Sequence, residues 1–180
     1  SSDAAYELDK KCKVPAHVLK TPIGIEATDK FLMEVARIAG KDIPYELEEE
    51  RGQVVDIMVD CHYHYHGKKV AIHGDTDIVI ALTEFVLSLG MIPKYVVTGT
   101  PGEAFEKEVT EMLKEAGVDG KVKAAGDLFT LHQWIKEEPV DLLIGTTHGK
   151  YIARAEDIPF VRLGFPILDR SVHSYMSIVG

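Results

Sequence analysis

The segment KVAIHGDTD, residues 69–77, decides the fold. Its short apolar run, Val70 to Ile72, predicts a buried strand of residues 69–73. The glycine and aspartates after it form a turn and a helix cap, and residues 78–89 then predict a helix that ends at Gly90. The same alternation continues, with further strands predicted at 94–98, 121–125, 140–144 and 160–163 and further helices at 103–116 and 128–136.

Continuous apolar strands that alternate with amphipathic helices indicate βαβ units and a parallel sheet covered on both faces. Right-handed crossovers then give an α/β fold, a Rossmann-like doubly wound domain of about five mainly parallel strands. Two helices are expected before it, at 28–39 and 45–66. We therefore predict an extended lead-in at 1–24, a helical leader at 25–67 and the Rossmann-like domain at 68–180.

The amino-acid composition limits the classes of protein to which this chain could belong. The 180 residues are 46% hydrophobic and 27% charged, which is typical of a globular protein. The formal charge of −9 argues against a non-specific nucleic-acid binder, and no apolar stretch is long enough to span a bilayer. Two cysteines are too few for a disulfide scaffold or for an iron–sulfur cluster that needs four thiolates. We expect a cytoplasmic protein.

The loops that follow the predicted strands form the candidate ligand site. In an open α/β sheet, ligands bind in the crevice outside the carboxyl ends of the strands. No G-x-G-x-x-G follows the first strand and no P-loop is present, which disfavours a dinucleotide or ATP site. The glycines could also simply terminate strands. The residues predicted to face a ligand are Thr98, Gly99, Thr100, Gly145, Thr146, Thr147 and His148.

The tract of residues 56–66 is the richest in potential metal ligands. On a helix, Asp56 and Asp60 lie one turn apart, and His64 continues the same face. Carboxylates and an imidazole suit a divalent cation, although a solvated helical face would have the same composition. The sequence alone leaves both interpretations open, and no G-x-S-x-G turn supports nucleophilic catalysis.

Several longer motifs carry a family resemblance. These are VVTGTPG (96–102), LHQWIK (131–136), DLLIGTTHGKYIAR (141–154) and IPFVRLGFPILDR (158–170), with PIGIEATDKFL (22–32), ERGQVVD (50–56) and HGKKVAIHGD (66–75) upstream. Over about residues 20–180 the chain resembles the β-chain family of nitrogenase component 1, as a carboxyl-terminal domain fragment. The TGTPG and HQWIK variants are similar to those of alternative, iron-only or vanadium–iron, nitrogenases.

The resemblance implies an oxidoreductase complex that reduces dinitrogen to ammonia with electrons from an ATP-dependent iron protein. Its implied partners are a nitrogenase α chain, a second β chain and the iron protein. The complex would contain an iron–sulfur P-cluster and an iron-containing catalytic cofactor. Neither is expected in this segment, because Cys12 and Cys61 match none of the family's cluster ligands. No catalytic residue is assigned, and the isolated segment is expected to be inactive, with a structural and assembly role.

The same family places a metal ion on two aspartates at the contact between two β chains, and Asp56 and Asp60 match that motif. Other functions stay open beside the nitrogenase one. A cofactor-assembly scaffold and a dark-operative reductase subunit belong to the same superfamily, and a stand-alone ligand-binding Rossmann-like domain would have the same fold.

Overall fold

The computed structural model describes residues 2–164. The last part of the family motif, residues 165–170, and the end of the predicted domain lie outside the described residues. The chain divides between Ile43 and Pro44 into two compact units, so the two helices of the predicted leader fall in different units. No helix in the described part of the chain is both long and apolar enough to cross a membrane.

The first unit contains α1 (Ser2–Cys12) and α2 (Ile25–Ala39). The extended lead-in predicted for residues 1–24 is therefore wrong over α1. Its alanine, leucine, glutamate and lysine residues favour a helix, and the Glu7 carboxylate lies 3.6 Å from the Lys10 ammonium and 4.0 Å from that of Lys11. The helix α1 lacks the wide apolar stripe from which a helix is predicted in a sequence. By contrast, α2 ends as predicted at Gly40, in the left-handed conformation with φ 62°.

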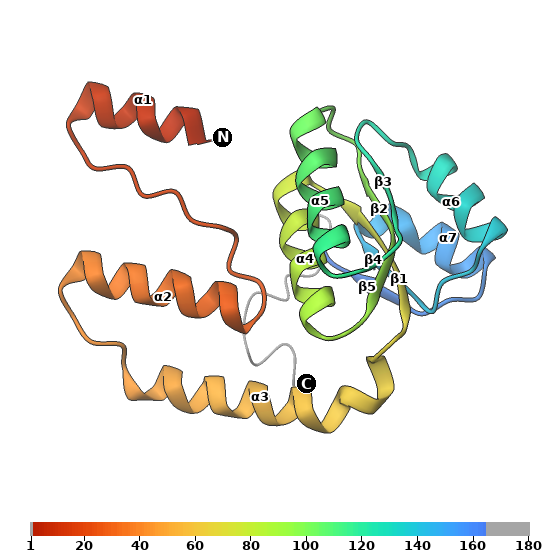
Figure 1. The fold of residues 1–180 in the computed structure, drawn as a ribbon, viewed down its shortest axis with the longest axis horizontal. Coiled ribbons are helices and arrows are strands. Elements are labelled where there is room, and N and C mark those ends of the chain that lie inside the picture. The colour runs from red at the N-terminus through yellow and green to blue at the C-terminus, as the bar shows by residue number, and fades with distance from the viewer. Residues whose placement is uncertain (1, 165–180) are drawn as a thin grey trace. The chain divides into compact units, whose positions relative to one another are not determined.

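The second unit is an α/β domain with a five-stranded parallel sheet, as predicted (Figure 1). The strands run in the order β3-β2-β1-β4-β5. Their bounds are β1 (Lys69–Gly74), β2 (Ile92–Thr98), β3 (Lys121–Lys123), β4 (Leu142–Gly145) and β5 (Phe160–Arg162). The helices are α3 (Tyr45–Tyr65), α4 (Thr76–Ser88), α5 (Glu103–Glu115), α6 (Leu128–Glu137) and α7 (Lys150–Ala155), with a 3₁₀ turn η1 (Thr147–Gly149).

Helices cover both faces of this sheet. Figure 1 shows α4 and α5 on one face and α6 and α7 on the other. The central strand β1 is buried at every position from Val70 to His73, because it has a strand on each side and a helix layer on each face. The core under α6 and α7 consists of Ala71, Tyr95, Val97, Leu131, Ile135, Val140, Leu143, Ile152 and Ala153.

Candidate functional site

The register of the sheet brings the ends of three strands together. His73 pairs with Val97 of β2 and with Gly145 of β4, so the carboxyl ends of β1, β2 and β4 lie side by side. From β1 the chain continues to β2 and β3 on one side, while β4 and β5 lie on the other. This reversal of strand order is where open α/β sheets form a ligand crevice.

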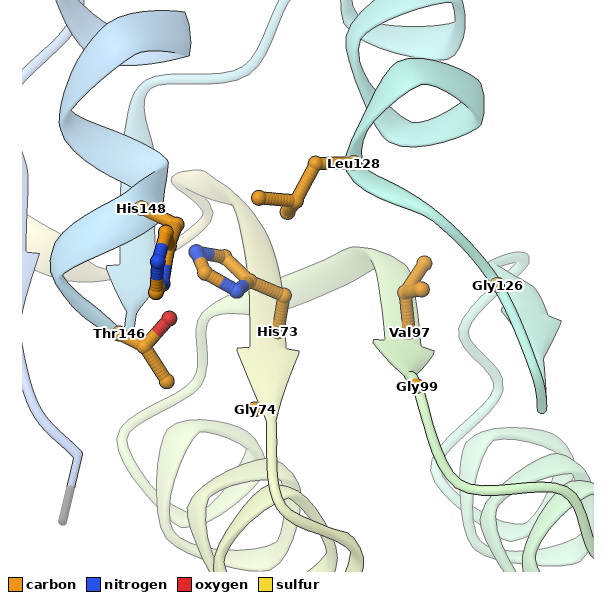
Figure 2. A pocket seen from close by; sticks show the side chains of 8 residues that line it. All are labelled: His73, Gly74, Val97, Gly99, Gly126, Leu128, Thr146 and His148. Atoms are coloured by element: carbon orange, nitrogen blue, oxygen red, sulfur yellow. The ribbon is translucent and has the colours of Figure 1, made fainter.

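A pocket of about 180 Å³ opens at this edge (Figure 2). Figure 2 shows the imidazoles of His73 and His148 beside Thr146 at one end of the pocket, with Val97 and Leu128 toward the other. The lining therefore combines two imidazoles and one hydroxyl with an apolar wall. Its residues are His73, Gly74, Val97, Gly99, Gly126, Leu128, Thr146 and His148.

Three of the seven predicted crevice residues line this pocket: Gly99, Thr146 and His148. The other four, Thr98, Thr100, Gly145 and Thr147, do not line it. Thr98 is fully buried, and its hydroxyl lies 3.3 Å from the Thr76 hydroxyl and accepts from the Thr100 backbone N–H. Thr98 and Thr100 therefore stabilise the turn that follows β2, and they do not line the pocket.

Sequence reasoning missed the imidazole at the centre of the pocket. His73 is only 5% exposed, and its ring fits against Gly145 and Gly149. A Cβ at either glycine would overlap the ring, so two glycines leave the space that the imidazole occupies. The available signal was a histidine as the last side chain of a buried strand, immediately before Gly74. Gly126 has a similar role beside Val97, whose Cγ1 would lie 2.6 Å from an added Cβ.

The helices that start at this edge carry acidic side chains at their amino-terminal ends. Asp77 lies in the first turn of α4, Glu103 and Glu106 lie in that of α5, and Asp127 caps α6. A helix amino terminus attracts anions, and these carboxylates already supply negative charge at three of them. A phosphate group would meet electrostatic repulsion there, which agrees with the missing dinucleotide and P-loop motifs.

The Asp127 cap makes α6 sensitive to acid. Its carboxylate accepts from the Thr130 backbone N–H at 2.7 Å, and this bond holds the pKa of Asp127 below its ordinary value of 3.8. A lowered folded-state pKa adds stability above the unfolded value, and that stability is lost as the pH falls through the folded value. Asp127→Ala should therefore lower the urea midpoint at neutral pH, and by less below pH 3.8. A deficit in the urea midpoint that is the same at both pH values would contradict this assignment.

The predicted metal ligands Asp56 and Asp60 do not line the pocket. Asp56 and Asp60 are exposed on α3, one helical turn apart. Within residues 2–164, no three His, Cys, Asp or Glu side chains come together in a way that could hold a metal ion. Two carboxylates supply only part of the six to eight oxygens that a hard cation such as Ca²⁺ prefers.

The cysteines do not fit an iron–sulfur cluster. Cys12 and Cys61 are both free thiols on exposed positions, and they belong to different units of the chain. Such clusters are usually held by four thiolates. The two thiols of this chain therefore do not make up the ligand set of such a cluster.

Comparison with known proteins gives matches along the whole chain. A family described as nitrogenase component 1 type oxidoreductase matches residues 1–180. The chain is 58% identical over 177 residues to a nitrogenase molybdenum-iron protein beta chain from Clostridium pasteurianum, covering 98% of this chain and 39% of that one. The corresponding chain of Frankia alni is 43% identical over 178 residues, with coverages of 98% and 34%.

A solved structure titled "Nitrogenase Cp1 at pH 6.5" has the same fold. It superposes with a TM-score of 0.88 at 58% identity, and the match covers 95% of this chain and 38% of that chain. The chain thus spans less than two-fifths of the length of these relatives. Both named relatives are molybdenum–iron proteins, so the similarity to an alternative nitrogenase has no support from them and stays a prediction.

Proposed function

The chain belongs to the nitrogenase component 1 type oxidoreductase family, and from this premise we propose that it forms part of a component 1 β subunit. The complete complex would reduce dinitrogen to ammonia with electrons from an ATP-dependent iron protein. Its other partners would be an α chain and a second β chain in the cytoplasm. The observation that carries the proposal is the 58% identity to a β chain over 98% of this sequence.

Within that complex, this segment has a structural and assembly role. The parent complex would contain the P-cluster and the catalytic cofactor, both held by residues outside this chain. The two free cysteines are exposed and belong to different units of the chain, and they support this assignment because an iron–sulfur cluster is usually held by four thiolates. A cofactor-assembly scaffold or a dark-operative reductase would share the fold, but both named relatives are described as nitrogenase β chains.

The direct test uses the full-length protein, purified with its native partner chains. Isotope-labelled dinitrogen, the iron protein, ATP and a reductant are supplied, and labelled ammonia is measured. We expect ammonia that disappears when either ATP or the iron protein is omitted. A complex that binds a cofactor precursor but forms no ammonia would identify a scaffold and overturn the proposal.

We further propose that the crevice at the strand ends is a ligand-facing surface that does not take nucleotides. The pocket between β1, β2 and β4, and the carboxylates at the starts of α4, α5 and α6, support this proposal. Calorimetric titration with NAD or ATP should give no saturable heat. Tight binding of either, abolished by a bulky residue at Gly99, which lines the pocket and has open space beside it, would contradict it.

Asp56 and Asp60 are proposed to bind a divalent cation at the contact between two β chains. The exposed pair offers carboxylate oxygens, and a partner chain or water would supply the remaining ligands. Asp60→Asn removes one anionic ligand and also a like-charge repulsion within the helix. We expect the variant to lose the bound cation and to dimerise less tightly, as measured by metal analysis and sedimentation of the full-length complex. Unchanged metal content and dimerisation would exclude this site.

A further inference from the structure

The carboxyl-terminal end of α3 brings two imidazoles together on exposed positions. His62 and His66 are four residues apart, and their ring centroids lie 4.6 Å from each other at an interplanar angle of 31°. Both residues are exposed. A His-x-x-x-His spacing at a helix presents two ring nitrogens to the same volume of solvent, which is how two histidines on one helix can share a metal ion.

The structure holds one of these two rings in place. His66 caps α3, and its backbone N–H donates to the His62 carbonyl oxygen at 3.0 Å. Its ring lies against Gly90, where an added Cβ would meet the Nδ1 edge and lie 2.8 Å from Cε1. Gly90 has a φ of 73° and accepts from the Gly67 backbone N–H, which ties this turn to the end of α3. The Nε2 atom lies on the side of the ring farther from Gly90.

We propose that His62 and His66 together bind one divalent transition-metal ion such as Zn²⁺, Ni²⁺ or Cu²⁺. Imidazole nitrogen suits these ions, whereas Ca²⁺ and Mg²⁺ prefer oxygen. Since no group of three or more potential ligands forms among the described residues, water completes the coordination. We expect this histidine pair to bind Cu²⁺ more tightly than Ni²⁺ or Zn²⁺.

This site is distinct from the proposed cation site on the same helix. Asp60 and His62 are two residues apart, and side chains with that spacing do not face each other on a helix. The aspartate pair offers oxygens to a hard cation, while the histidine pair offers nitrogens to a borderline one. The two sites therefore respond to different ions and to different substitutions.

The test measures Zn²⁺ binding to the full-length protein by equilibrium dialysis. His62→Gln and His66→Gln should each remove one bound Zn²⁺ per chain at micromolar Zn²⁺ and weaken that binding at least ten-fold. The matched control is His64→Gln, an exposed histidine between the two, and it should bind Zn²⁺ as the parent protein does. Equal Zn²⁺ binding by the parent and both test variants, or an equal loss in His64→Gln, would overturn the proposal.

A second measurement requires no substitution. One equivalent of Cu²⁺ added to the unaltered protein should give an electron paramagnetic resonance spectrum with coupling to two ring nitrogens. A spectrum without nitrogen coupling, or with coupling to one nitrogen only, would overturn the proposal whatever the variants do.

Discussion

Gly145→Ala should lower the free energy of unfolding of this chain by about 2–3 kcal/mol. The added Cβ would overlap the His73 ring and lie 2.6 Å from the His73 carbonyl oxygen. Both residues belong to central strands that pair with each other, so neither backbone can move without disturbing the sheet. Overpacking of this kind forces side chains and backbone out of their preferred positions.

The matched control is Gly99→Ala, in the same crevice. An added Cβ at Gly99 would meet nothing within 4 Å, so we expect a change within about 0.5 kcal/mol. Urea denaturation of both variants measures the difference. If the two glycine variants unfold at the same urea concentration, His73 is not packed against Gly145 in the way described.

Tyr95→Ala should be more damaging, at about 3–5 kcal/mol, the range for removing a large buried ring. Tyr95 is fully buried in β2, and its ring centroid lies 5.6 Å from that of Trp134 on α6. Its hydroxyl donates to the backbone carbonyl oxygens of Trp134 and Glu138, each at 3.0 Å. The Tyr95 side chain therefore fills part of the core and hydrogen-bonds to backbone carbonyl oxygens at the end of α6. Leu128, the first residue of α6, lines the pocket.

Tyr95→Phe separates these two contributions. It keeps the ring but removes the hydroxyl, and we expect a loss of about 1–2 kcal/mol because the Glu138 carbonyl oxygen loses its donor, while the Trp134 carbonyl oxygen still accepts from the Glu138 backbone N–H. Chemical denaturation of both variants gives the comparison. A phenylalanine variant as unstable as the alanine variant would mean that the hydrogen bonds, and not the packing, carry most of the effect.

The strands could be predicted because each is a continuous apolar run, but their ends depend on contacts that the sequence does not show. The third strand was predicted to reach residue 125, whereas β3 ends at Lys123. Ala124 donates its backbone N–H to the Glu106 carboxylate, and Ala125 takes a φ of 47° with its N–H on the Thr100 carbonyl oxygen. These bonds turn the chain away from the sheet toward α6.

Short helices without a strong pattern were missed. No helix was predicted between the strands at 140–144 and 160–163, but η1 and α7 lie there. The helix α7 has six residues and buries only Ile152 and Ala153, too few positions to establish a helical period. From sequence alone, so short a helix cannot be distinguished from a loop, because the contacts with the sheet that stabilise it are not visible there.

Three of the seven residues predicted to face a ligand line the pocket, and the function of the pocket stays a prediction. Parallel strands place their carboxyl ends at one edge, so the loops containing Gly99 and Thr146 could be assigned to it from order alone. His73 could not be assigned to the pocket from sequence. Its position there depends on the strand register that pairs it with Gly145 and on the glycines that leave space for its ring.

If this chain forms part of a nitrogenase β subunit, as proposed, it should replace the matching segment of a known β chain. The 177 matching residues of the Clostridium pasteurianum β chain are replaced by those of this chain, and the chimera is produced with its α chain. Reduction of labelled dinitrogen is then measured with the iron protein and ATP. We predict that the complex assembles and forms labelled ammonia. A chimera that assembles but forms no ammonia, or that fails to bind the α chain, would show that this chain is not a nitrogenase β-chain segment.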